Sequence, residues 1–262
     1  NGKTALDLVY QIIDQLIKKK IKPIVGIGVG TPGLVHTREG IVVNAVNLEW
    51  QDLPLGQLLE KKYKIPVSVL NDSQATAIGE FVYGGNHASD TNLIVVNVKH
   101  GIGSGILVNG RLFGAGEIGL VVVQENGELC RCGKNGCLDT VSSARAVLKQ
   151  LKLNSLEKAQ AAFDSGDAKA NQVVENAAHF LGISLANLIG TLNIQKIVLT
   201  GDMTRFGTKW LDAVNASMRN AALSRLSENT ELELGRLDYR ACILGATPFI
   251  IKNYYSLLLV SS

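Results

Sequence analysis

The segment Val67-Ser68-Val69-Leu70-Asn71-Asp72-Ser73-Gln74 joins an apolar run to two polar residues and then to a helical pattern. The apolar run predicts a buried strand, and residues 73–83 return to helical spacing. Asn71 and Asp72 therefore follow the carboxyl end of a strand, where α/β sheets place ligand-binding residues. An amide beside a carboxylate suits a polyol, because the carboxylate accepts from one hydroxyl while the amide both donates and accepts.

Two other roles are open for this pair. Asx residues commonly turn the chain and cap the helix that follows, here the one expected from Ser73. In an enzyme, Asp72 would instead take a proton from an attacking hydroxyl as general base. Taken alone, the pair favours the capping role and the binding role about equally.

Strand and helix patterns continue on both sides of this segment and predict an α/β fold. Apolar residues repeat at helical spacing near residues 6–17, 55–62 and 212–226, and through most of residues 141–192. Strands are expected at residues 24–30, 41–43, 92–98, 105–108 and 196–200. The glycine-rich residues 101–105 are expected to join two of these strands, and a lobe boundary is expected near residues 85–92.

Composition limits the classes of protein that fit. With 262 residues, 46% of them hydrophobic, the chain can bury one large core or two smaller ones, which excludes a disordered chain and favours one two-lobed unit. A formal charge of +3 does not indicate a nucleic-acid surface. No signal-peptide pattern precedes the first helical repeat, and no apolar run approaches the roughly 20 residues that span a bilayer. We therefore expect a cytoplasmic protein without membrane contact.

Three of the four cysteines, Cys130, Cys132 and Cys137, lie within eight positions. In a reducing compartment this clustering suggests metal ligation rather than a disulfide framework. A tight glycine-containing loop can turn three thiolates toward one zinc ion at about 2.3 Å, which leaves a tetrahedral site one ligand short. Cys242 lies in an apolar run and is expected to be a buried small hydrophobic residue.

Four motifs, in this order and spacing, resemble the ROK family of repressors, open reading frames and sugar kinases. They are Gly28-Val29-Gly30-Thr31-Pro32-Gly33-Leu34-Val35, Asn71-Asp72-Ser73-Gln74-Ala75, Gly116-Glu117-Ile118-Gly119 and Cys130-Arg131-Cys132-Gly133-Lys134-Asn135-Gly136-Cys137-Leu138-Asp139. The resemblance implies a two-lobed, actin-like ATPase domain with ribonuclease H-like lobes. Residues 1–88 would be the remainder of an N-terminal lobe that is incomplete at its N-terminus. Residues 89–262 would form the C-terminal lobe with a cysteine loop at 130–137, and a late helix is expected to return to the first lobe.

The resemblance also implies a monosaccharide site. Its sugar contacts would come from Gly33, Asn47, Asn71, Asp72, Glu117 and Asp139, and Asp72 occupies the position of the catalytic base in the family's kinases. Asp139 stands where the family usually carries Glu. Because its side chain is one methylene shorter, it would reach the sugar through water or not at all.

Leu120 is the most informative departure from the family pattern. The family carries a histidine there that completes a structural zinc site and lies beside the sugar, and leucine does neither. Three retained thiolates still favour a structural zinc ion over a metal-free loop. The fourth ligand is left open among His100, Glu125, Glu128 and water.

Two further departures bear on nucleotide binding. His100 replaces a phosphate-side threonine, and Asp202 replaces the second glycine of an adenosine-side turn. In a kinase, Gly101, Gly103 and Gly201 would contact Mg-ATP. An aspartate at that turn disfavours a nucleotide, so the departures favour the repressor branch, in which a winged-helix DNA-binding domain precedes the ROK domain.

Three functions follow as alternatives. The first is a sugar sensor whose lobes close on the ligand and which reaches DNA only through a domain outside this chain. The second is an ATP-dependent sugar kinase with Asp72 as base, and the third is a scaffold with a decayed pocket. The resemblance implies a homodimer or homotetramer.

Overall fold

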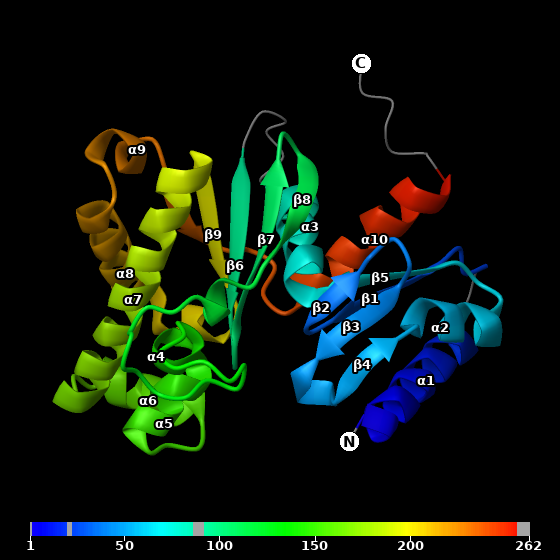
Figure 1. Ribbon diagram of the computed structural model, residues 1–262, viewed down its shortest axis with the longest axis horizontal. Helices are drawn as coiled ribbons and strands as arrows, with labels where there is room; N and C mark the ends of the chain where they lie inside the picture. The colour runs from blue at the N-terminus through cyan, green and yellow to red at the C-terminus, as the bar shows by residue number, and fades with distance from the viewer. Residues whose placement is uncertain (1, 20–22, 86–91, 256–262) are drawn as a thin grey trace.

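Two packed helices, α3 (Asp72–Tyr83) and α10 (Arg240–Tyr255), connect the two lobes of the protein (Figure 1). The computed structural model describes residues 2–19, 23–85 and 92–255. Each lobe is built on its own sheet, and helices cover the sheets, as expected for the actin-like fold.

The sheet of the second lobe has the strand order β10-β9-β6-β7-β8. β6 pairs antiparallel with β7 and parallel with β9, β7 pairs antiparallel with β8, and β9 pairs parallel with β10. Both faces of β6 are covered, so all six of its residues are buried. The strands are β6 (Leu93–Val98), β7 (Ile102–Val108), β8 (Arg111–Gly116), β9 (Lys196–Thr200) and β10 (Glu231–Leu234).

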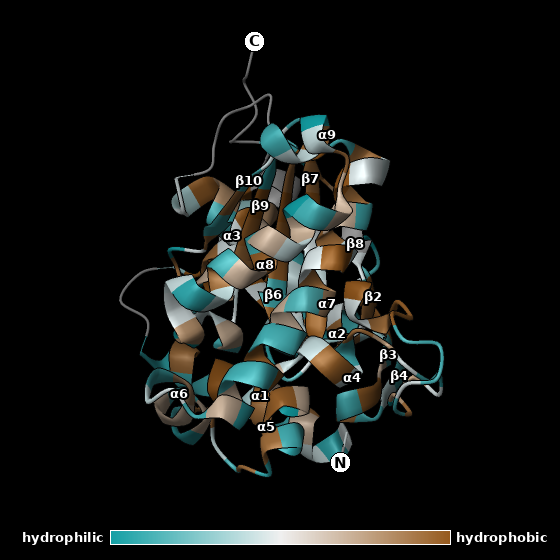
Figure 2. Ribbon diagram, turned by 90° about the vertical axis from the view of Figure 1, so that its left-hand side faces the viewer, coloured by the Kyte–Doolittle hydropathy of each residue, from teal (hydrophilic) through white to brown (hydrophobic). Residues whose placement is uncertain are grey.

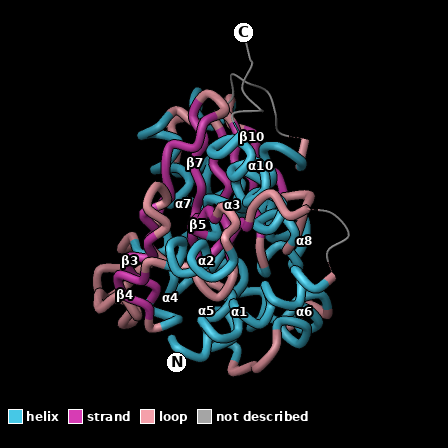
Figure 3. Tube along the Cα trace, turned by 90° about the vertical axis from the view of Figure 1, so that its right-hand side faces the viewer, coloured by secondary structure: helices cyan, strands magenta, loops and turns pink. Residues whose placement is uncertain are grey.

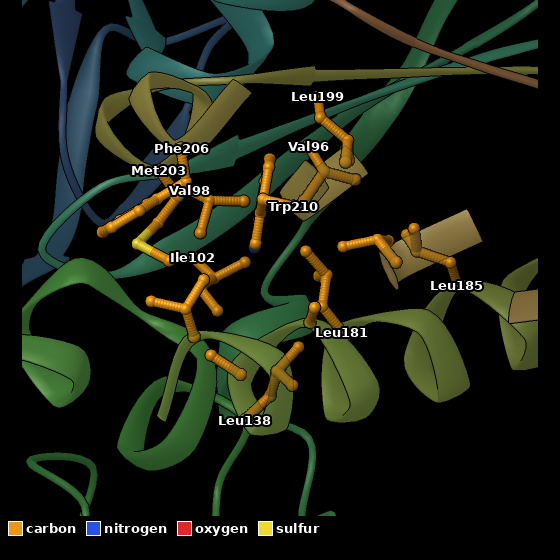
Figure 4. Close-up of a cluster of buried hydrophobic side chains, with 14 of the residues drawn as sticks. Val96, Val98, Ile102, Leu138, Leu181, Leu185, Leu199, Met203, Phe206 and Trp210 are labelled. Carbon is orange, nitrogen blue, oxygen red and sulfur yellow. The ribbon is translucent and has the colours of Figure 1, made fainter. Parts of the chain in front are cut away.

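Helices α7 (Ala168–Leu192) and α8 (Gly207–Ala221) pack against each other, and their apolar residues join the sheet in the largest core (Figure 4). Trp210, Leu181 and Leu199 lie in this core at 1% exposure or less. Figure 2 shows hydrophilic and hydrophobic residues alternating along α7 and α8, which is the pattern of helices with one buried face. α7 is long and apolar enough to cross a membrane, but more than half of its most apolar window is buried inside the protein, as in a core helix.

Four helices and two short helical turns complete this lobe around the core. η2 (Ile118–Leu120) follows β8 and leads to the cysteine loop at residues 130–137. The others are α4 (Asp139–Ser142), α5 (Ala144–Leu151), α6 (Leu156–Asp164), η3 (Asp202–Phe206) and α9 (Ser224–Glu228).

The first lobe contains one parallel pair of strands, β1 (Ile27–Thr31) and β5 (Val67–Asn71). A separate antiparallel sheet, β2-β3-β4, follows β1. Helix α1 is tied to α2, because the Tyr63 hydroxyl donates to Asp14 at 2.8 Å and to the Tyr10 carbonyl at 3.2 Å. Figure 3 shows this side of the lobe. The remaining elements are α1 (Gly2–Lys18), β2 (Leu34–His36), β3 (Ile41–Ala45), η1 (Val46–Leu48), β4 (Trp50–Leu53) and α2 (Leu55–Tyr63).

Each lobe packs against a helix that follows a strand of the other lobe. α3 follows β5 of the first lobe but packs on β6 and β7 of the second, whereas α10 follows β10 and packs on β1 of the first. Glycines allow the two helices to touch, since a Cβ on Gly79 would lie 2.0 Å from the Ala241 carbonyl oxygen and one on Gly245 would lie 1.8 Å from that of Ala75. Each lobe thus depends on a helix from the other.

Most of the predicted elements occur close to their expected positions, with three differences. β1 begins at Ile27 rather than at residue 24, and the helix expected at residues 212–226 is divided into α8 and α9. The prediction that residues 101–105 form a loop was wrong, because β7 begins at Ile102. The glycines there admit α3, since a Cβ on Gly103 would lie 2.4 Å from Ser73 Oγ and one on Gly105 would lie 2.5 Å from the Ser73 carbonyl oxygen.

Candidate functional site

A cavity of about 510 Å³ between the lobes collects most of the polar residues singled out from the sequence. Its walls include all six expected sugar contacts, together with Gly101, Gly103, Cys130 and Cys132. Gly201 and Cys137 do not border it. A larger cavity of about 1110 Å³ shares only Gln74 with the four motifs, so the smaller cavity is the candidate site.

Asn71 takes the capping role that the sequence left open. Its side-chain oxygen accepts from the backbone N–H groups of Ser73 and Gln74, at 2.9 and 3.2 Å, and so caps α3. Its Nδ2 donates to the carbonyl oxygen of Gly33 at 2.8 Å and ties β5 to the turn after β1. The cap therefore fixes where Asp72 begins the helix, while one N–H of the amide has no further bond among the described residues.

Asp72 is the first residue of α3, half-buried at the wall of the cavity. Burial raises the pKa of its carboxyl group above the ordinary value of 3.8, and the nearby Lys99 opposes that rise. The helix N-terminus favours the ionised form, and the Ser73 hydroxyl lies 3.4 Å from Asp72 Oδ1. A partly desolvated carboxylate in this position can accept a hydrogen bond or a proton from a ligand hydroxyl.

Glu117 and Asp139 approach the same cavity from the second lobe. Glu117 lies exposed just before η2, and its pKa is raised by partial burial and then by the negative charges of Asp72 and Asp139. Asp139 is buried at 5% exposure, and burial raises its pKa although its Oδ1 accepts from the Ile102 N–H at 2.7 Å. The three carboxyl groups thus border one cavity, where their oxygens can accept hydrogen bonds from a hydroxyl-rich ligand.

Arg131 was not anticipated as part of this site. Its guanidinium group donates to the side-chain oxygen of Asn47, which lies in η1 of the first lobe, and its Nη2 lies 3.8 Å from Asp139 Oδ2. Its position in the sequence, between the expected metal ligands Cys130 and Cys132, could have drawn attention to it, because a tight turn there limits the directions in which its side chain can point. Residue type alone did not reveal which partners it meets.

The cavity continues toward two exposed turns of the second lobe. His100 lies in the turn between β6 and β7, and Asp202 begins η3 after β9. His100 Nδ1 lies 3.9 Å from Asp202 Oδ2, so the two residues that depart from the kinase pattern meet each other. Gly201, with φ of 94°, precedes Asp202 and sets the entry into η3.

The cysteine loop lies beside this cavity. The sulfur atoms of Cys130, Cys132 and Cys137 lie within 4.8 Å of one another, and those of Cys132 and Cys137 are 3.5 Å apart. Tetrahedral zinc–thiolate geometry places sulfur atoms about 3.8 Å apart, so the three thiols fit one zinc ion. A backbone N–H at Lys134 lowers the pKa of Cys132, while burial raises that of Cys137 to about 12.

None of the protein side chains considered as a fourth ligand joins this group within the described residues. His100 is directed to Asp202, and Glu128 forms an ion pair with Lys149 at 2.5 Å. Leu120 contributes only its carbonyl oxygen, 3.5 Å from the Cys137 sulfur.

Comparisons with known proteins agree with this architecture. The family model described as "ROK family" matches residues 2–253. A glucokinase from Halalkalibacterium halodurans is 33% identical over 87% of this chain and 76% of its own length. A xylose repressor from Caldicellulosiruptor bescii is 28% identical over 96% of this chain and 69% of its own length. Among solved structures, a ROK family transcriptional regulator described as a homologue of the E. coli MLC protein superposes with a TM-score of 0.84 at 26% identity, covering 95% of this chain and 67% of that one.

Proposed function

The chain belongs to the ROK family, and from that premise we propose that it is the sugar-sensing, effector-binding domain of a transcriptional regulator. The proposal rests on one observation: the three carboxyl groups border one cavity, whereas His100 and Asp202 face each other where a kinase would hold phosphate and adenosine. The family includes relatives of both kinds, so the proposal is argued from the residues of the site.

The ligand class that suits the site is a monosaccharide. A cavity of about 510 Å³ is in the range of small-molecule sites, and Asp72, Glu117 and Asp139 offer acceptors to several hydroxyl groups. Asp139 has one oxygen bound to the Ile102 N–H, so its remaining oxygen would reach a sugar through water or through a shift of Arg131.

Sugar binding would close the two lobes about the crossing of α3 and α10. Asn47 and Asp72 belong to one wall and Glu117 and Asp139 to the other, so a ligand that bonds to both walls binds the closed form more tightly. Only that difference in affinity can shift the equilibrium between open and closed forms. In a homodimer or homotetramer, closure would alter the spacing of DNA-binding domains that lie outside this chain.

The cysteine loop would hold a structural zinc ion through Cys130, Cys132 and Cys137, with water as the fourth ligand. Bound zinc would fix the loop beside the cavity and supply no reacting group. A thiolate-bound metal suits the reducing conditions of the cytoplasm, where we place this protein.

A sugar kinase is the second candidate, because Asp72 has the position and the shielded carboxyl group of a general base. Calorimetry with a panel of hexoses and pentoses, run beside a coupled assay for ADP release, distinguishes the two. We expect sugar binding in the micromolar to millimolar range without ADP release. Sugar-dependent ADP release that Asp72→Asn abolishes would establish the kinase instead, and absence of sugar binding would exclude both.

A further inference from the structure

One contact crosses the cleft without using Asp72 or Glu117. It joins Arg131, in the cysteine loop of the second lobe, to the side-chain oxygen of Asn47 in η1 of the first lobe, 84 positions away in the sequence. Both residues border the cavity, so the contact forms part of its wall. We call it the Arg131–Asn47 strap.

On its second-lobe side, the strap lies beside the buried carboxyl group of Asp139. The Arg131 guanidinium lies 3.8 Å from Asp139 Oδ2, and the Asp139 side chain is only 7% exposed with its other oxygen held by the Ile102 N–H. A planar guanidinium has donors in two directions, so it can face Asp139 and Asn47 at the same time. The contact therefore joins a buried carboxyl group of the second lobe, through Arg131, to η1 of the first lobe.

The cysteine turn fixes the backbone from which Arg131 projects. The N–H of Cys130 donates to the Lys134 carbonyl at 2.8 Å, and that of Gly133 donates to the Cys130 carbonyl at 3.0 Å. The two residues that flank Arg131 are both members of the thiol group. Any ligand of these thiols would restrict the direction of the Arg131 side chain.

The strap leaves room for a ligand. With the contact in place the cavity still measures about 510 Å³, which is enough for a monosaccharide. A bound sugar and the strap can therefore exist together, and the strap lowers the cost of closing the lobes rather than blocking the site.

We propose that Arg131 is a positioning residue that straps the two lobes together through Asn47 and makes sugar affinity depend on the state of the cysteine loop. The part of the proposal that concerns the lobes rests only on the contact between Arg131 and Asn47. The effect on sugar affinity rests in addition on the proposed sugar-sensing function.

Hydrogen exchange on the sugar-free protein tests the strap by itself. Arg131→Ala is expected to speed exchange at Val46–Leu48 in the opposite lobe, and Asn47→Ala is expected to speed exchange in residues 130–137, because coupling between two sites is reciprocal. Lys134→Ala, which removes a charge from the same loop, is the matched control and leaves η1 unchanged. Unchanged exchange at Val46–Leu48 in Arg131→Ala would overturn the strap whether or not the protein binds sugar.

Calorimetry with the tightest-binding sugar of the panel then measures the effect on affinity. Arg131→Ala is expected to weaken binding about tenfold in the wild type and to have no further effect in an Asn47→Ala background, because the contact is already lost there. Arg131→Lys, which keeps the charge but not the planar fork, restores only part of the affinity. Additive losses would show that the two side chains act separately.

The link to the cysteine loop has its own readout. Metal analysis should find equal zinc in the wild type and in Arg131→Ala, and a chelator should weaken sugar binding by the wild type while leaving Arg131→Ala unchanged. An equal response of both proteins to the chelator would refute the link. If the wild type binds no sugar, the proposed function fails, and hydrogen exchange at Val46–Leu48 with and without chelator decides the link instead.

Discussion

The two ends of the cleft are built in opposite ways. At the end proposed to bind sugar, burial raises the pKa values of Asp72, Glu117 and Asp139, and the charges of the other two carboxyl groups raise that of Glu117 further. At the nucleotide end, the side chains of His100 and Asp202 are 75% and 38% exposed and lie 3.9 Å apart. Keeping several carboxyl groups out of water is costly, so their retention at one end points to a ligand there.

The difference teaches that the two ends of one cleft can differ in how far their charged side chains are shielded from water. A solvent-exposed pair such as His100 and Asp202 contributes little to stability, so nothing in the fold requires it. Under the proposed function, Asp202 would place a carboxylate where the nucleotide of a kinase would approach, which would disfavour an anionic ligand. The predictions below test each end in turn.

The largest effect is expected from Asp72→Ala at the sugar end. Loss of a hydrogen bond to a charged acceptor removes roughly 1.5–3 kcal/mol, so sugar affinity should fall by about 10- to 100-fold in calorimetry. Asp164→Ala, an exposed carboxylate at the end of α6, is the control and leaves affinity unchanged. Unaltered affinity in Asp72→Ala would remove Asp72 from the ligand site.

The cysteine loop gives the next largest effect. Cys137→Ser replaces a buried thiol and removes one of three metal ligands, so the loss of bound zinc should lower the free energy of unfolding by about 2 kcal/mol or more. Denaturant unfolding with and without a chelator measures this. Cys242→Ser lies outside the thiol group and should retain the response of the wild type to the chelator. A wild type that contains no zinc would contradict the assignment of the loop.

Acid should change sugar affinity and stability in opposite directions. The pKa values of Asp72 and Glu117 lie above the ordinary 3.8 and 4.5, so affinity should fall as the pH drops through these raised values and the acceptors become protonated. A carboxyl group whose pKa is raised by folding contributes stability that is present below its unfolded pKa and is lost as the pH rises through the folded pKa.

The stability of the wild type relative to Asp72→Asn should therefore increase as the pH falls through the same window. Parallel denaturant and calorimetric titrations of both proteins check the two signs. If the relative stability instead decreased with acid, the Asp72 carboxyl group would be stabilised in its ionised form by the fold.

The smallest effect is expected at the nucleotide end. Asp202→Gly removes a partly exposed negative charge, so binding of a non-hydrolysable ATP analogue should strengthen about fivefold from a weak starting value. Asp202→Asn removes the charge without adding the backbone flexibility of glycine. It should give most of the increase in affinity for the analogue. If the wild type already binds the analogue tightly, the end of the cleft with His100 and Asp202 accepts a nucleotide, and the kinase is favoured.

Much of the fold and of the candidate site follows from local patterns. The apolar run that ends at Leu70, the polar pair after it and the helix that follows all occur as predicted, because strand burial, capping and helical spacing act over a few residues. The three thiols also meet as predicted, since they belong to one short loop. These features depend on neighbours in the sequence, so the sequence by itself determined them.

Other features depend on residues that meet only after the lobes pack. The glycines of β7 resemble a loop until α3 lies against them, and no local pattern indicates that the exposed Arg131 faces η1 across the cleft. The exchange of α3 and α10 likewise brings together segments more than 150 positions apart. Tertiary structure alone decided these contacts, because they depend on the positions of whole elements that no local pattern of residues specifies.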